Sequence, residues 1–224
     1  FGTDGVGVSV RRQSDNKKLK LGFYKLYENN VELNDDVSMF ELNQQFTVSP
    51  TWNVGASAYY IRDNSSGKGG VSILGQGYGS LLTSYNGAYR FPIGANPYHS
   101  DILWLGTYFS KNEDMMMGRW FMSGFFNYNL GSIRQKAPTS TSYEKTVSIG
   151  GIAANLRAGY RYGQTTGDAI VADMLFTSGD KNGMADNKYS GVLTSNTWGS
   201  PGAIFIGHGG YLLFPHGNVV NRFV

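Results

Sequence analysis

Alternation of apolar and polar residues is the main pattern in this chain, and it is clearest from residue 147 to residue 163. Read at a period of two, one face carries Asn155, Arg157 and Arg161. The opposite face carries Ile152, Ala154, Leu156, Ala158, Tyr160 and Tyr162. Successive side chains of a β-strand point to opposite faces. The stretch therefore predicts a strand with one apolar face and one cationic, hydrogen-bonding face.

The same alternation recurs along the chain and predicts about nine or ten antiparallel strands. They are expected at residues 5–12, 18–27, 37–48, 52–62, 101–110, 118–131, 147–163, 169–178 and 203–216. Residues 71–90 are less regular and fit either a strand or a segment folded into a pore. Polar loops are expected at 29–36, 63–70, 91–100, 134–145 and 179–201. Short turns thus alternate with long loops, which is typical of outer-membrane barrels.

A soluble β-sandwich or solenoid would also explain alternation, but it fits other features less well. The predicted strands run to about 10–14 residues, whereas strands in globular sheets are usually about 5–6 residues long. Aromatic residues stand at strand ends, as Trp52 and Tyr60 do, which is the spacing of a membrane-facing strand. The pattern therefore favours an all-β fold, an antiparallel transmembrane β-barrel or a contiguous part of one, as a single domain over residues 1–224.

Composition excludes several other classes of protein. The 224 residues include 31 Gly but only 6 Pro, and 16% are charged. No run approaches the ~18 apolar residues of a membrane helix. The net charge of +3 is spread along the chain rather than gathered into a basic stripe, so nucleic acid is not an expected partner. The absence of cysteine excludes disulfides and thiol chemistry.

Charged residues on the polar faces are the candidate functional residues. A cationic track inside a lumen would attract anionic solutes, because a low-dielectric channel focuses the potential of its lining charges. The candidate cations and amide are Arg11, Lys20, Arg119, Asn155, Arg157 and Arg161. The alternative is ordinary lumen solvation with cross-strand ion pairs to Glu41 or Asp173.

Metal binding and catalysis are not expected, and no cofactor is implied. Asp180, Asn182 and Asp186 offer hard oxygens, but their spacing does not match a calcium loop of the EF-hand type, so a solvated loop is favoured. The three histidines, His99, His208 and His216, are scattered and have no nucleophile elbow beside them. An outer-membrane hydrolase is therefore disfavoured.

One stretch also resembles a known family. The sequence NLRAGYRYGQTTGDAIVADMLFTSGD, residues 155–180, resembles the later strands of large Gram-negative outer-membrane barrels, most closely the alginate-export-like barrel group. The matching features are a strand with Arg157, Arg161 and Tyr162, followed by a strand leading into Ser178-Gly179-Asp180. The resemblance covers about a tenth of the chain.

That resemblance implies a location and a role. Members of the group have about eighteen strands, so the chain would be part of a longer barrel in the outer membrane, with the lipid bilayer and a small polar or anionic solute as partners. The start at Phe1 and the end shortly after a predicted strand also favour a segment. The alternative role is a non-transporting barrel that acts as a structural or adhesive scaffold through its long loops.

Overall fold

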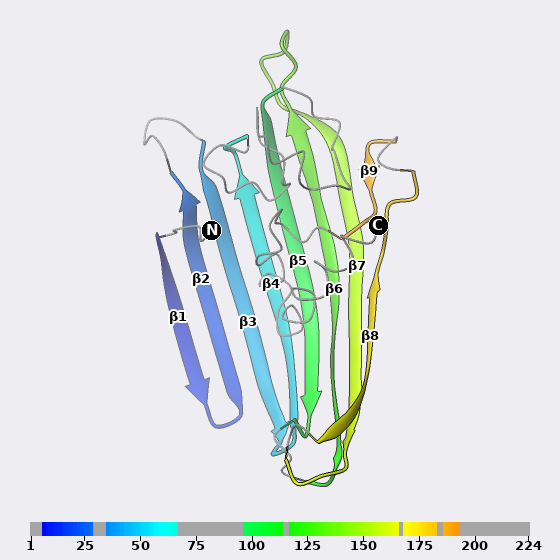
Figure 1. Cartoon of the computed structure of the whole chain (residues 1–224). Helices are drawn as coiled ribbons and strands as arrows, with labels where there is room; N and C mark the ends of the chain where they lie inside the picture. Colours follow the sequence, from blue (N-terminus) through cyan, green and yellow to red (C-terminus); the bar gives the residue numbers. More distant parts are fainter. Residues whose placement is uncertain are drawn as a thin grey trace.

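The computed structural model describes residues 6–28, 35–66, 96–113, 117–165, 168–182 and 186–192, and there the chain forms a single curved sheet without helices (Figure 1). The strands are β1 (Val6–Ser14), β2 (Lys17–Tyr27), β3 (Val37–Ser49), β4 (Trp52–Asp63), β5 (Tyr98–Lys111), β6 (Trp120–Gln135), β7 (Glu144–Arg161), β8 (Ala169–Thr177) and β9 (Lys188–Tyr189).

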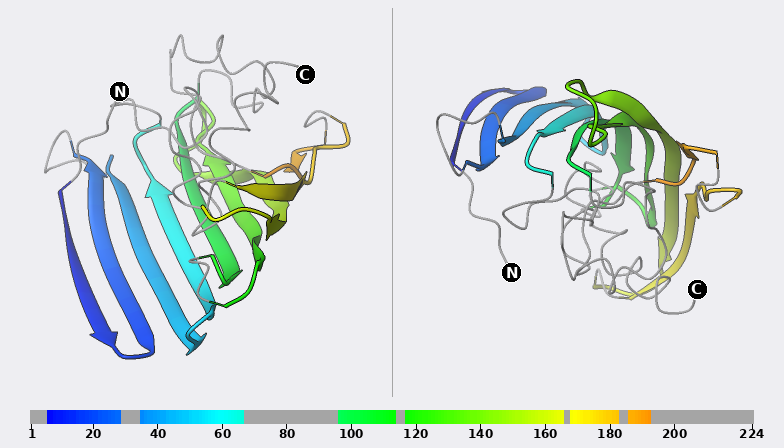
Figure 2. Two further views of the ribbon diagram at one scale, coloured as in Figure 1. Left: turned by 60° about the horizontal axis from the view of Figure 1, so that its bottom comes forward. Right: turned by 90° about the horizontal axis from the view of Figure 1, so that it is seen from above.

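The strands from β1 to β8 follow one another in chain order, and each pairs antiparallel with the next. The short β9 instead pairs parallel with β7 at Ser148 and Ile149, on the part of that edge that β8 leaves uncovered. An all-β antiparallel fold is thus confirmed. Among the described residues β1 and β8 are not paired with each other, so the sheet is open there (Figure 2).

Several strands are longer than the alternation predicts. Tyr98 begins β5 inside the predicted 91–100 loop, while β6 and β7 extend into the predicted 134–145 loop. Those loop boundaries were wrong because Pro97 and the polar residues after Arg134 suggested a break. Pro97 stands just outside the ladder, and its carbonyl accepts the Lys136 N–H at 3.0 Å. The predicted strand at 203–216 and the irregular stretch at 71–90 lie outside the described residues, as do His208 and His216.

The two ends of the sheet differ in their connections. Asp15 and Asn16 alone join β1 to β2, and Pro50 and Thr51 alone join β3 to β4. We call this the short-turn end, although the connections at 112–119 and 162–168 on the same side are longer. At the opposite, long-loop end, residues 28–36, 64–97 and 136–143 connect the strands. The predicted alternation of short turns and long loops therefore holds from β1 to β5, whereas the connections at 112–119 and 136–143 are equal in length.

The two faces of the sheet have opposite polarity and opposite burial. On the outer face, large apolar side chains are exposed, and Leu105, for example, is 42% exposed. On the inner face, polar side chains are buried, and Asn127 is 1% exposed. The exposed outer side chains are Val6, Val8, Val10, Leu21, Phe23, Phe40, Leu42, Phe46, Val48, Leu105, Trp120, Phe126, Tyr128, Leu156, Ile170, Met174 and Phe176.

The inner face also carries a buried apolar cluster toward the long-loop end. Ile61, Ile102 and Trp104 are at its centre, and Trp104 is 1% exposed. Tyr189 of β9 joins this cluster, with Val192 packed against it. Toward the short-turn end the inner face is mixed, because the buried rings of Tyr108, Phe121 and Phe125 lie among polar side chains. These polar side chains are Gln45, Thr47, Asn53, Ser110, Ser123, Arg157 and Asp173, placed by the strand register.

Candidate functional site

Glu41 is the centre of a polar cluster on the inner face of β2–β4. Its carboxylate forms an ion pair with Lys20 at 2.6 Å. The hydroxyl of Tyr24 donates to Oε2 at 2.9 Å, and that of Tyr59 donates to Oε1 at 3.5 Å. The structure thus brings two predicted residues together as a cross-strand ion pair, so the carboxylate neutralises Lys20. Arg11 is the register partner of Lys20 and lies exposed on β1.

Three more predicted residues meet on β7 and β8. The Asn155 amide donates to Asp173 Oδ1 at 2.6 Å and to the carbonyl of Met174 at 3.0 Å. Arg157 is the register partner of Asp173. Its side chain is half-buried, and its Nε is buried without a hydrogen bond. Among the described residues, Arg157 therefore has no bound acceptor on the inner face, and the exposed Arg11 has none either.

Arg161 and Arg119 hold the connections at the short-turn end. Arg161 is only 4% exposed, donates from Nη1 to the carbonyl of Asn112 at 2.8 Å, and donates from Nη2 to the carbonyl of Glu113. Its guanidinium lies 4.2 Å from the ring centroid of Phe121. Arg119 donates to the carbonyl of Tyr162 at 2.9 Å. The predicted cationic residues therefore fall into three separate groups rather than one track.

Tyrosines on the inner face were not among the residues selected from the sequence. Tyr24 and Tyr59 contact Glu41, and the Tyr108 hydroxyl donates to Asn43 Oδ1 at 2.9 Å. In an alternating pattern a tyrosine is usually counted as apolar, which hides its hydroxyl. A search for tyrosine in phase with the polar positions of each strand would have found all three.

In the predicted oxygen-rich loop, two carboxylates accept hydrogen bonds from backbone N–H groups. Asp180 Oδ1 accepts the N–H of Ser190 at 3.0 Å, and Asp186 Oδ1 accepts the N–H of Lys188 at 3.1 Å. Asn182 is exposed. A different acidic group, Glu28, Asp35 and Asp36, places ligand atoms within 4.8 Å of one another. Lys25 forms ion pairs with Glu28 and Asp36 there, so part of this charge is already neutralised.

His99, Ser100 and Asp101 do not form a catalytic set. Because neighbouring residues of a strand face opposite sides, His99 and Asp101 lie on the outer face and Ser100 on the inner face. His99 stacks on Tyr143 with ring centroids 3.8 Å apart, and Asp101 binds Arg134.

The exposed apolar side chains of the outer face form a belt bounded by aromatic side chains and a lysine at one end and by charged side chains at the other. At the short-turn end, Lys111 lies 5.2 Å from the ring centroid of Trp52, and Trp120 packs on Tyr160 with centroids 5.0 Å apart. At the long-loop end a row of charged residues follows the belt. Lys25, Arg62 and Asp101 belong to this row, and Arg134 lies in the next one.

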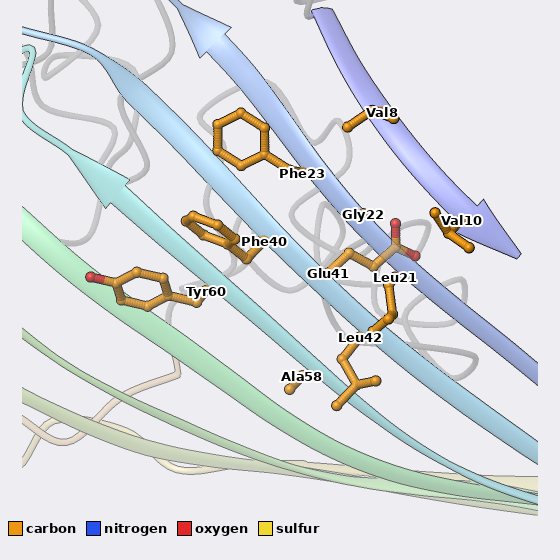
Figure 3. Close-up of a pocket in the computed structure, with 10 residues that line it drawn as sticks. All are labelled: Val8, Val10, Leu21, Gly22, Phe23, Phe40, Glu41, Leu42, Ala58 and Tyr60. Carbon is orange, nitrogen blue, oxygen red and sulfur yellow. The ribbon is translucent and has the colours of Figure 1, made fainter.

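The outer face is also hollowed over β1–β4. This hollow has a volume of about 470 Å³ and a mostly apolar lining (Figure 3). Its aromatic side chains contact one another, with ring centroids 5.0 Å apart for Phe23 and Phe40 and 6.0 Å apart for Phe40 and Tyr60.

In comparisons with known proteins, no family model and no curated protein matches this chain. In the part of the chain that the structure describes, no helix is long and apolar enough to cross a membrane.

Proposed function

We propose that this chain forms part of the wall of a β-barrel in the outer membrane of a Gram-negative bacterium. The observation that carries the proposal is that the sheet exposes its apolar face and buries its polar face. An exposed apolar face this large is rare on a soluble monomer, where such patches mark interaction surfaces. Facing lipid, the same side chains are in their preferred environment, while the polar face lines the interior.

The dimensions of the belt support this proposal. On β6 the outer side chains from Trp120 to Leu130 are apolar or small. At about 3.3 Å per residue, this stretch is about 33 Å long. A strand tilted by about 40° would then cover about 25 Å along the membrane normal, which is the height of the apolar band of membrane barrels. Trp52, Trp120 and Tyr160 would lie at the headgroup level of the short-turn end.

A membrane location requires the sheet to close. Unpaired edge strands cannot persist in lipid, because their N–H and C=O groups have no water to bind. Strands beyond β1 and β8 would complete the barrel, in agreement with the resemblance of residues 155–180 to the large alginate-export-like barrels.

Within that barrel we propose a passage for small polar or anionic solutes. The polar side chains of the inner face toward the short-turn end support it, with Arg157 offering a cation that is not bound to a neighbouring carboxylate. Conduction would draw on such lining charges for its selectivity.

A second function, a non-transporting scaffold, is favoured by a different observation. The apolar cluster at the long-loop end buries Ile102, Trp104 and Tyr189 on the inner face, where an open channel would need water. A barrel whose interior is blocked by this cluster would not conduct, and its function would then depend on its loops. No enzymatic activity is proposed in either case.

Refolding the full chain in detergent micelles and transferring it to planar bilayers would separate these possibilities. A heat-modifiable band on gels and stepwise conductance would support the channel. Insertion without conductance would favour the scaffold. A folded monomer in plain buffer that ignores lipid vesicles would contradict the membrane proposal.

A further inference from the structure

The hollow on the outer face lies next to a group of cationic residues that is not neutralised. Val8, Phe23, Phe40 and Tyr60 lie side by side across β1–β4, as Figure 3 shows. Arg62 follows Tyr60 by two residues on the same face of β4, about 7 Å farther along the strand. An open apolar hollow and a charged group thus lie within the reach of one amphipathic ligand.

The cationic residues belong to two neighbouring rows of the register. In one row Arg62 lies opposite Asp101 in the strand register. In the next row His99 lies opposite Arg134, and Arg134 lies opposite Lys145. On β4–β7 these rows hold three cationic side chains, Arg62, Arg134 and Lys145, and a single carboxylate. Asp101 is already engaged, because it accepts from Arg134 and from the Tyr60 hydroxyl at 2.5 Å.

Like the exposed Lys145, Arg62 is therefore an unengaged cation of this rim in the described part of the chain. It is exposed, and its guanidinium makes no hydrogen bond or ion pair with any residue in the described ranges. The equivalent position on β2 is different, because Lys25 is bound there by Asp36 and by Glu28. The surplus positive charge is thus confined to β4–β7, directly beyond the apolar belt at the long-loop end.

We propose that this hollow and rim together bind one anionic lipid. Its acyl chain would lie in the hollow over β1–β4, and its phosphate would bind Arg62, with Arg134 and Lys145 adding to the field. The volume of about 470 Å³ is within the range of about 300–1,000 Å³ for small-ligand sites. A guanidinium matches a phosphate in geometry as well as charge. This inference rests on the proposed membrane location, because the hollow needs lipid beside it.

Native mass spectrometry of the full chain in micelles, titrated with phosphatidylglycerol or phosphatidylcholine, tests the site. We expect one phosphatidylglycerol to bind more tightly than phosphatidylcholine. Arg62→Gln should reduce this preference about fivefold, the factor expected for one cation beside an anionic headgroup. Ala58→Leu, which fills the hollow, should weaken both lipids alike. Lys111→Gln, at the opposite end of the belt, is the matched control and should change nothing.

An unchanged preference in Arg62→Gln, or an equal loss in Lys111→Gln, would overturn the proposal. Release of the lipid by millimolar inorganic phosphate would also overturn it, because the acyl chain would then contribute nothing. Insertion of the wild-type chain into phosphatidylcholine vesicles is measured first. If the chain inserts but has no lipid preference, only the lipid site fails; if it folds as a monomer in plain buffer and ignores the vesicles, the membrane proposal itself fails.

Discussion

Tyr108 lies flat over Gly55, its register partner on the neighbouring strand. A Cβ added to Gly55 would be 2.2 Å from Cζ of the Tyr108 ring. The ring can cover the glycine only because no side chain is there, and this position lets the hydroxyl reach Asn43 at 2.9 Å. A glycine in mid-strand thus orients a tyrosine whose hydroxyl contributes to the polar inner face.

Gly55→Val should destabilise the sheet by about 1–3 kcal/mol, because the added side chain forces the tyrosine ring out of place. Gly150→Ala is the matched control, since a Cβ there meets only the Tyr128 hydroxyl at 3.8 Å. Urea unfolding of the refolded protein in micelles would measure both. Equal stability of the two variants would show that the ring moves aside freely.

Leu105→Arg tests the environment of the outer face. Leu105 lies midway along the belt, so an arginine there should cost about 2–4 kcal/mol if the face contacts the bilayer midplane. Ser132→Arg, in the charged row at the long-loop end, should cost little. The measurement is the yield of folded protein in vesicles. Unchanged yield for Leu105→Arg would mean that this face is not in lipid.

Glu41→Gln should increase the anion preference of the conducting protein, because Lys20 would lose its counter-charge. It should also reduce stability by about 1–3 kcal/mol, since two tyrosine hydroxyls and an ammonium currently bind the carboxylate. Reversal potentials in a salt gradient would measure the selectivity. Glu144→Gln, an exposed carboxylate near the long-loop end, is the control and should leave the reversal potential unchanged.

Arg161 and Arg157 should behave differently on substitution. Arg161→Met leaves two carbonyls without donors and should cost about 3 kcal/mol, with no specific effect on ion selectivity. Arg157→Gln should cost less than about 1 kcal/mol and should reduce anion preference. Unfolding and reversal-potential measurements on both variants would check this contrast. A selectivity change in Arg161→Met alone would contradict it.

The turn between β7 and β8 should loosen in acid. The backbone N–H of Thr165 and its hydroxyl bind Asp168 at 3.1 and 3.0 Å and lower the pKa of that carboxyl. A lowered pKa stabilises the folded turn above the unfolded carboxyl pKa of about 3.9, and this contribution is lost as the pH falls through the folded value. The Thr165 amide should therefore become less protected from hydrogen exchange as the pH falls below about 3.9, once the exchange rates are corrected for their intrinsic pH dependence. Asp168→Asn should remove this pH dependence.

The strands were largely predictable because one physical rule, alternation between two environments, governs most of them. Val37 to Val48 and Trp52 to Arg62 were each placed within one residue of the observed β3 and β4. The ends of β5, β6 and β7 were not, because polar residues at strand ends carry no alternation. Only the pairing partner shows that Arg134 and Lys145 belong to the ladder.

The grouping of the charged residues was less predictable. Alternation places Arg157 and Arg161 on the same face, but it does not show that Arg161 binds carbonyls at residues 112 and 113. That contact depends on the fold of a connection distant in sequence. The ion pair between Lys20 and Glu41 similarly depends on the register of β2 against β3, which the alternation within each strand does not specify.

The unequal connections also have a kinetic consequence. The hairpins β1–β2 and β3–β4 close over two residues each, so their pairing involves little loop entropy. Pairing of β4 with β5 must instead close residues 64–97, and contacts distant in sequence form more slowly. The strands before and after that connection should therefore assemble as two halves. Their joining along β4 and β5 would be the late, rate-limiting step of folding in this sheet.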